Sequence, residues 1–129
     1  MRVSRGFALI EMVVVISVML ILLAVAMPIY SGSLRAANED NFRTNLRTLN
    51  DLIYQYTLDK KKAPKSLDDL RTAGYIKEIP EDITRRADTW VPEEEEDTIM
   101  FPDQKETGII GVHSGSNAIG SDGRAYSEW

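Results

Sequence analysis

One carboxylate, Glu11, lies four residues into a long apolar run near the start of the chain. From Phe7 to Met27 the only other polar residue is Ser17. An ionised group in hydrocarbon costs several kcal/mol unless it is paired or neutralised. Glu11 therefore needs a cationic partner at its own depth, or a place near the lipid headgroups where it is protonated or reaches water.

The other reactive side chains give little support to catalysis. His113 is the only histidine, and alone it makes neither a zinc site nor a catalytic triad. The chain has no cysteine, which excludes a disulfide and thiol chemistry. The stretch GSNAIG does not have the spacing of a phosphate-binding loop. With 15 basic and 20 acidic residues there is no basic stripe for nucleic acid, so we expect neither an enzyme nor a nucleic-acid-binding protein.

Two stretches are rich in oxygen atoms. Residues 93–97 read EEEED, and because consecutive carboxylates repel one another we expect a solvated acidic surface there. It could oppose Arg85 and Arg86 of the same or a neighbouring subunit. Residues 113–123 read HSGSNAIGSDG and should turn repeatedly. Such a stretch either supplies oxygens to a cation such as calcium or closes on itself through Asx-type hydrogen bonds.

The apolar run has the length of a membrane span. Residues 7–27 in a helix cover about 30 Å, the thickness of a hydrocarbon core. Arg2 and Arg5 precede the run, and no basic residue follows before Arg35, so residues 1–6 should stay in the cytoplasm. A cleaved secretory signal is the alternative, with an A-x-A pattern at residues 24–26. The run is too long for that reading and continues into a helical pattern.

The elements beyond the span predict an α+β fold. Pro28 should kink or locally open the helix, and residues 31–59 should continue it with one buried face before Pro64 stops it. That face is formed by Leu34, Phe42, Leu46, Leu49, Ile53 and Tyr56. A short helix should follow over residues 66–76, with Ser66 as its N-cap and Gly74 after its end.

The last third of the chain has the texture of loops and short strands. Residues 79–97 are charged and interrupted by prolines, so we expect a loop, whereas residues 98–101 and 108–114 are short β-type runs. Aromatic residues there should anchor the domain by packing: Trp90, Tyr126 and Trp129. We therefore expect a small antiparallel sheet laid on the outer half of the long helix.

The stretch RGFALIEMVVVISVMLILLAVAMPIY resembles the N-terminus of type IV pilins and of type II secretion pseudopilins. The resemblance covers the leader, the Gly6–Phe7 junction, Glu11, the apolar helix and Pro28. It implies a pilin-like fold, cleavage by a prepilin peptidase between Gly6 and Phe7, and methylation of the new amine of Phe7. It also implies that Glu11 pairs with the N-terminal amine of a neighbouring subunit, which relieves two unfavourable charges at once. Pro28 would let the helix loosen as the filament packs.

The remainder of the chain is similar to the major pseudopilin of type II secretion systems. That resemblance implies calcium in the C-terminal loop, although this loop holds one carboxylate and the family's is usually more acidic. The candidate ligands are Ser114, Ser116, Asn117 and Asp122, a carbonyl near Ile119, and Asp88 from the preceding loop.

Together these observations predict a single-pass precursor that becomes a filament subunit. Residues 1–6 would be a cleaved leader, residues 7–30 the membrane and filament-core helix, and residues 31–129 a soluble domain. The implied role is the major pseudopilin of a type II secretion system in a periplasmic filament; the alternatives are a surface type IV pilus and a single-span binding module. The implied partners are further copies, the membrane, a prepilin peptidase, an inner-membrane assembly platform and minor pseudopilins.

Overall fold

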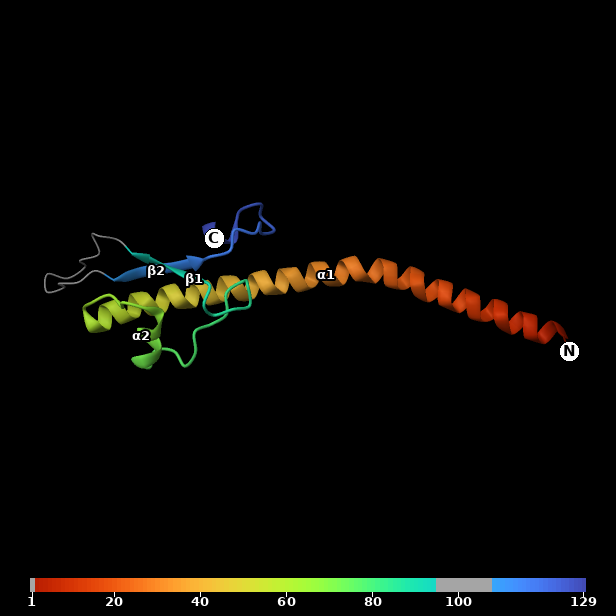
Figure 1. The fold of residues 1–129 in the computed structure, drawn as a ribbon, viewed down its shortest axis with the longest axis horizontal. Coiled ribbons are helices and arrows are strands. Elements are labelled where there is room, and N and C mark those ends of the chain that lie inside the picture. Colours follow the sequence, from red (N-terminus) through yellow and green to blue (C-terminus); the bar gives the residue numbers. More distant parts are fainter. Residues whose placement is uncertain (1, 95–107) are drawn as a thin grey trace. The chain divides into compact units, whose positions relative to one another are not determined.

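The computed structural model describes the backbone of residues 2–94 and 108–129, and the side chains of residues 5–94 and 108–129. The elements are α1 (Arg2–Lys60), α2 (Leu67–Thr72), β1 (Trp90–Glu94), β2 (Ile109–Ser114) and a 3-10 turn, η1 (Tyr126–Glu128) (Figure 1). The chain divides into two compact units, Met1–Ala37 and Asn38–Trp129. Helix α1 contributes to both.

In the first unit α1 continues through Pro28. Proline has no N–H, so the carbonyl four residues earlier loses its helical donor. Just beyond, the Ser31 hydroxyl donates to the Pro28 carbonyl (3.0 Å) and the Ser33 hydroxyl to the Ile29 carbonyl (3.1 Å). Such bonds to carbonyls three or four residues back are compatible with a helix, although they often bend it. Residues 30–33, which contain Gly32, accordingly stay helical.

In the second unit the later half of α1 carries the core. Phe42, Leu49 and Ile53 are fully buried, Tyr56 is buried beside them, and Leu46 packs against the cluster. These spacings keep the side chains on one helical face, as the sequence predicts for Phe42 onward. The prediction is wrong for Leu34, which is 45% exposed, because it lies on α1 before the core cluster that begins at Phe42. Burying each large side chain contributes roughly 2–3 kcal/mol. Helix α1 ends at Lys60, and Lys61 turns the chain with a left-handed φ of 53°.

Helix α2 has the predicted N-terminal cap at Ser66. The Asp69 carboxylate reaches back to accept the backbone N–H groups of Lys65 (2.8 Å) and Ser66 (3.3 Å). These donors would otherwise have no helical partner. The first turn of α2 is therefore held by a side chain three residues inside it.

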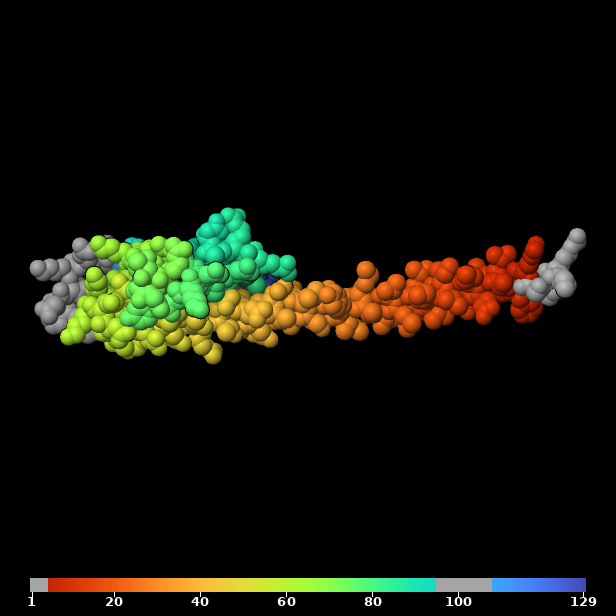
Figure 2. All heavy atoms as spheres, turned by 90° about the horizontal axis from the view of Figure 1, so that it is seen from below, coloured from red at the N-terminus to blue at the C-terminus, as the bar shows by residue number. Residues whose placement is uncertain are grey.

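The end of α2 is a Schellman turn. Gly74 adopts a φ of 85°, its N–H donates to the Arg71 carbonyl (3.1 Å), and the Tyr75 N–H donates to the Leu70 carbonyl (3.0 Å). The Tyr75 hydroxyl then donates to Asp59 on α1 (2.7 Å), which raises the pKa of Tyr75. In Figure 2, α2 and the loop after it (green) lie over the later, yellow part of α1.

The sheet has two antiparallel strands, with Trp90 opposite Ser114 and Pro92 opposite Val112. Strand β2 confirms the prediction for residues 108–114. The prediction of a loop throughout residues 79–97 is wrong at its end, because β1 begins at Trp90. A proline is compatible with this strand because β1 lies at the edge of the sheet, where Pro92 interrupts no ladder. The strand expected at residues 98–101 lies outside the described residues.

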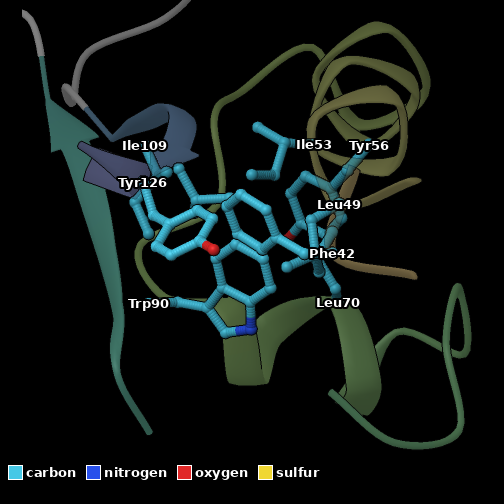
Figure 3. Close-up of a cluster of buried hydrophobic side chains, with 9 residues drawn as sticks. Phe42, Leu49, Ile53, Tyr56, Leu70, Trp90, Ile109 and Tyr126 are labelled. Carbon is cyan, nitrogen blue, oxygen red and sulfur yellow. The ribbon is translucent and has the colours of Figure 1, made fainter. Parts of the chain in front are cut away.

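Aromatic side chains close the core between α1, the sheet and the C-terminal segment (Figure 3). The Phe42 ring stacks on Trp90 with centroids 5.8 Å apart and meets Tyr126 edge-on at 5.8 Å. Trp129 packs against Phe42 at 5.9 Å and Tyr126 at 5.1 Å. Trp90, Tyr126 and Trp129 are thus packing anchors, as predicted. The architecture is α+β, with a small antiparallel sheet on the later part of a long N-terminal helix.

Candidate functional site

The apolar segment of α1 buries none of its large side chains in the described part of the chain. The exposed fraction runs from 49% at Val15 to 70% at Phe7 and Met27. One stretch of α1 is long and apolar enough to cross a membrane. An apolar surface that continues around a helix is stable only in lipid or against other apolar surfaces.

Glu11 is exposed on this segment. Within residues 5–94 and 108–129, no hydrogen bond or ion pair engages its carboxylate. In a helix, residues four apart share a face and side chains tilt towards the N-terminus, so Glu11 lies on the face of Phe7. The carboxylate is therefore on the side of α1 that carries Phe7, and within residues 5–94 and 108–129 no cation pairs with it.

Gly6 has no packing role in this fold. A Cβ placed on Gly6 would meet nothing within 4 Å. Glycine inside a helix costs roughly 0.5–1 kcal/mol relative to alanine. A glycine at this position therefore does not stabilise α1, and a requirement outside the fold would explain it.

The polar residues within and beside the apolar segment bond to their own helix. The Ser17 hydroxyl donates to the Val13 carbonyl at 2.7 Å, as Ser31 and Ser33 do further along α1. A hydroxyl satisfied in this way can lie in hydrocarbon at little cost. Among the side chains of residues 7–27, this leaves Glu11 as the polar group whose needs the helix itself does not meet.

The carboxylates proposed as calcium ligands are each engaged by an arginine. Asp88 accepts two bonds from Arg86, at 2.9 Å to Nε and 2.6 Å to Nη2, and these hold the pKa of Asp88 below its ordinary value. Asp122 accepts the Arg124 backbone N–H at 3.0 Å and its Nε at 2.9 Å, which likewise lower the pKa of Asp122. Calcium would have to compete with a guanidinium at both positions.

The remaining proposed ligands serve local hydrogen bonds. The buried Ser114 hydroxyl donates to Asp82 (2.8 Å), and the Ser116 hydroxyl accepts the Ala118 N–H (3.3 Å). The Asn117 side chain accepts the Ser127 hydroxyl (3.1 Å). Over residues 5–94 and 108–129, no three acidic or histidine side chains gather around one point. These side chains are thus engaged in local hydrogen bonds that close a cluster of turns, and they do not form a cage around a cation. Calcium binding stays a prediction.

Two buried carboxylates escaped the sequence analysis. Glu39 on α1 accepts the Ser121 N–H (3.0 Å), the Ser121 hydroxyl (2.5 Å) and the Tyr126 hydroxyl (2.8 Å). Glu39 is 3% exposed, so it fixes the C-terminal segment to the helix from inside the domain. Its neighbours Asn38 and Asp40 made it read as part of a polar face. The one available signal was its spacing of three from Phe42, on the buried face.

Asp82 is the second buried carboxylate and organises the loop before β1. It accepts the Thr89 hydroxyl (2.7 Å), the Ser114 hydroxyl (2.8 Å) and the Ile83 N–H (2.6 Å). These bonds tie the loop to both strands, because Thr89 precedes β1 and Ser114 ends β2. Nothing in the spacing of Asp82 along the chain distinguishes it from the exposed acidic residues around it.

Comparison with known proteins agrees with this arrangement. The family model for the Prokaryotic N-terminal methylation motif matches residues 1–27, which include Gly6, Phe7 and Glu11. The chain is 31% identical over 73 residues to competence protein ComGC of Halalkalibacterium halodurans. That alignment covers 57% of this chain and 72% of the relative. The chain belongs to the type IV pilin-like family. No solved structure matches it.

Membership of the pilin-like family accounts for the exposed apolar helix. Pilin-like chains are structural subunits of oligomeric filaments and are processed by a prepilin peptidase. A filament subunit covers its apolar helix with other copies of the same helix, so a single pilin-like chain leaves that surface open. The family resemblance inferred from residues 5–30 is thereby confirmed.

Proposed function

We propose that this chain is held in a membrane by residues 7–27, is cut between Gly6 and Phe7, and then packs those residues into the core of a helical filament. The observation that carries the proposal is the apolar helix, whose large side chains are all about half exposed or more. Before assembly lipid covers this surface, and afterwards neighbouring helices do. Arg2 and Arg5 keep the leader in the cytoplasm, where the peptidase would cut.

The processing step is supported by Gly6. A peptidase needs extended backbone that it can approach closely, and glycine supplies both. No packing contact explains Gly6 in the fold, so the requirement for a small residue fits the junction of a cleavage site. Cleavage would leave Phe7 with a cationic amine, which we propose is methylated.

Glu11 supplies the selectivity of assembly in this proposal. Phe7 and Glu11 are separated by about 6 Å of helical rise, so the amine and the carboxylate lie at nearly the same depth. A neighbouring amine can pair with Glu11 in one axial register, and the pairing removes two uncompensated charges from hydrocarbon. Pro28 would let α1 loosen as subunits leave the membrane.

The filament's role follows from which relatives it resembles. The alignment with a competence protein, covering 72% of that relative, favours a competence pseudopilus that serves genetic transformation. The second candidate is the major pseudopilin of a type II secretion system, which the resemblance seen in the sequence implies, and a surface pilus is the third. All three place the chain with an assembly platform and minor pseudopilins in the membrane.

A deletion strain separates these roles. The competence role predicts that transformation frequency falls to background while secreted proteins stay unchanged. The secretion role predicts that folded proteins are trapped behind the outer barrier, and the pilus role that surface fibres vanish. A strain that keeps all three properties would contradict the proposed function, and complementation with the wild-type chain is the control.

A further inference from the structure

In the loop between α2 and β1, Arg85 closes a tight turn that begins at Asp82. The Arg85 N–H donates to the Asp82 carbonyl (2.9 Å), and the Asp82 N–H donates to the Arg86 carbonyl (2.9 Å). Arg85 adopts a φ of 62°, a left-handed conformation that costs a residue with a side chain roughly 1–2 kcal/mol. The buried Asp82 side chain fixes the base of this turn. The fold thus maintains an unfavourable backbone conformation to place Arg85.

Arg85 has no counter-ion in the described part of the chain. Its neighbour Arg86 is committed to Asp88 through two bonds, whereas no ion pair or side-chain bond within residues 5–94 and 108–129 engages Arg85. The side chain is exposed. Within the described residues its guanidinium is therefore available to a further partner, while the backbone that carries it is held by the turn.

Arg85 borders an open cleft of about 350 Å³. Three asparagines of α1 line its other side: Asn38, Asn41 and Asn45. Their spacing of three and four places them on one helical face. The Asn45 amide donates to the Glu81 carbonyl (3.0 Å), which ties the loop to α1. A guanidinium with amide donors around it is suited to bind a carboxylate.

A matching carboxylate lies at the end of β1. Glu94 is exposed, and no bond within residues 5–94 and 108–129 engages its side chain. Its neighbour Glu93 pairs with His113 at 2.9 Å, so Glu94 is the carboxylate of β1 that remains available. In the sequence three more acidic residues follow it.

The two charges lie near different ends of strand β1. The Trp90 indole donates to the Pro80 carbonyl (2.7 Å), so the start of β1 lies beside the Arg85 loop. At the other end Glu94 is opposite Ile109, whose N–H donates to the Pro64 carbonyl (2.8 Å) beyond the end of α1. Five residues of strand separate these ends by about 13 Å. Within one copy Arg85 and Glu94 make no ion pair with each other, and the length of β1 between them favours a partner on another copy.

The sheet edges disfavour a contact made through the backbone. The Asn50 side chain accepts the Val112 N–H (2.9 Å) and donates to the Val112 carbonyl (3.5 Å), which occupies the outer edge of β2. On β1, Pro92 has no N–H to offer an added strand. Contacts between side chains are therefore favoured over strand addition at these two positions.

We propose that Arg85 of one subunit binds Glu94 of the next subunit along the filament, with the asparagines of the cleft as additional donors. This inference rests on the proposed filament. Complementary charges at two separate places on one domain make a head-to-tail contact, and repetition of such a contact gives an open helical array. The pair would set the axial register of the soluble domains as Glu11 sets that of the membrane helices.

The chain has no cysteine, which makes cross-linking a direct test. The full-length variant Arg85→Cys/Glu94→Cys is assembled into filaments and treated with a short bismaleimide. The expected product is a ladder of trimers and longer species, because every subunit is joined on both sides. Each single-cysteine variant is the matched control and cannot extend beyond a dimer. Filaments of the double variant that yield no species above dimer would overturn the contact.

Charge reversal gives an independent readout. Arg85→Glu should lower filament yield about tenfold, which corresponds to ~1.4 kcal/mol per contact, and Arg85→Glu/Glu94→Arg should restore it. Lys77→Glu, an exposed cation on the same loop, is the control and should leave the yield unchanged. Tryptophan fluorescence of each purified variant verifies folding. If Arg85→Glu assembles normally, the contact is wrong and the filament stands; if the wild-type chain never forms filaments, both proposals fail.

Discussion

The Tyr126 hydroxyl donates a 2.8 Å hydrogen bond to Oε1 of Glu39 inside the domain. This bond joins residues 87 positions apart in the chain, and Ser121 adds two more to the same carboxylate. A single buried residue of α1 therefore holds both the C-terminal loop and η1. The soluble domain depends on this polar anchor in addition to the aromatic core around Phe42.

Glu39→Ala should destabilise the second unit by about 3 kcal/mol, because it removes two bonds to Ser121 and leaves the buried hydroxyl of Tyr126 unsatisfied. Glu39→Gln should cost much less, since its carbonyl still accepts bonds and the Ser121 hydroxyl can rotate to accept from the amide. Urea unfolding of the full chain in detergent, followed by tryptophan fluorescence, measures both values. Trp90 and Trp129 are the only tryptophans and both lie in this unit.

Tyr126→Phe should cost about 1–2 kcal/mol, and its effect should largely vanish in a Glu39→Ala background. Such a double-mutant cycle isolates the bond from the packing of the ring, which phenylalanine retains. Fully additive losses would show that the hydroxyl and the carboxylate act independently.

Stability should fall in acid partly through Asp122. The backbone N–H and side chain of Arg124 hold the pKa of Asp122 below its ordinary value of 3.8 in the folded chain. The stability that this interaction contributes is therefore fully present above the pKa of Asp122 in the unfolded chain. It is lost as the pH falls through the lower pKa of the folded chain. Asp122→Asn should lose less stability than wild type below about pH 4 in the same fluorescence assay. The exposed Asp51→Asn is the control, and parallel curves for wild type and Asp122→Asn would contradict the assignment.

Much of the architecture could be predicted because it depends on local spacing. The apolar run, the buried face of α1 and the cap of α2 at Ser66 are all set by residues three or four apart. The N-terminal motif could be read for the same reason, since Gly6, Phe7 and Glu11 lie within one short stretch.

The remainder depends on contacts between distant segments. In the sequence nothing separates Glu39 from its polar neighbours, because its partners Ser121 and Tyr126 lie more than 80 residues away along the chain. Strand β1 was not predicted because it contains Pro92. A proline is compatible with this strand because β1 is an edge strand. Asp88 and Asp122 each pair with an arginine two residues away, whereas the sequence led us to expect Arg86 opposite the acidic residues 93–97 and gave no partner for Asp122.

Gly6→Leu should leave the precursor uncut, because a bulky side chain blocks close approach to the backbone at the junction. The structure predicts no loss of stability, since the position is open. Intact mass spectrometry of the membrane protein distinguishes the precursor from a chain that begins at methylated Phe7. Val3→Leu, in the same leader, is the control and should be cut normally. Complete processing of Gly6→Leu would contradict the proposal that the peptidase requires Gly6 at the cleavage site.

Calcium, if it binds the C-terminal loop, should raise the melting temperature of the full chain relative to a chelator. Asp122→Asn and Asp88→Asn should each reduce that shift, because they remove the carboxylate ligands. Magnesium at the same concentration controls for ionic strength. Identical melting temperatures in calcium and in chelator would contradict the prediction that this protein binds calcium.

The most direct test of the central claim is filament yield in Glu11→Ala. We expect a chain that is inserted and cut between Gly6 and Phe7 at wild-type levels and yet yields no sheared filaments, because no carboxylate pairs with the N-terminal amine of the neighbouring subunit. Ser17→Ala removes the other polar side chain of the span and should assemble normally. Wild-type filament yield from Glu11→Ala would contradict the proposed pairing of Glu11 with a neighbouring amine, since assembly would then proceed without the one charge in residues 7–27.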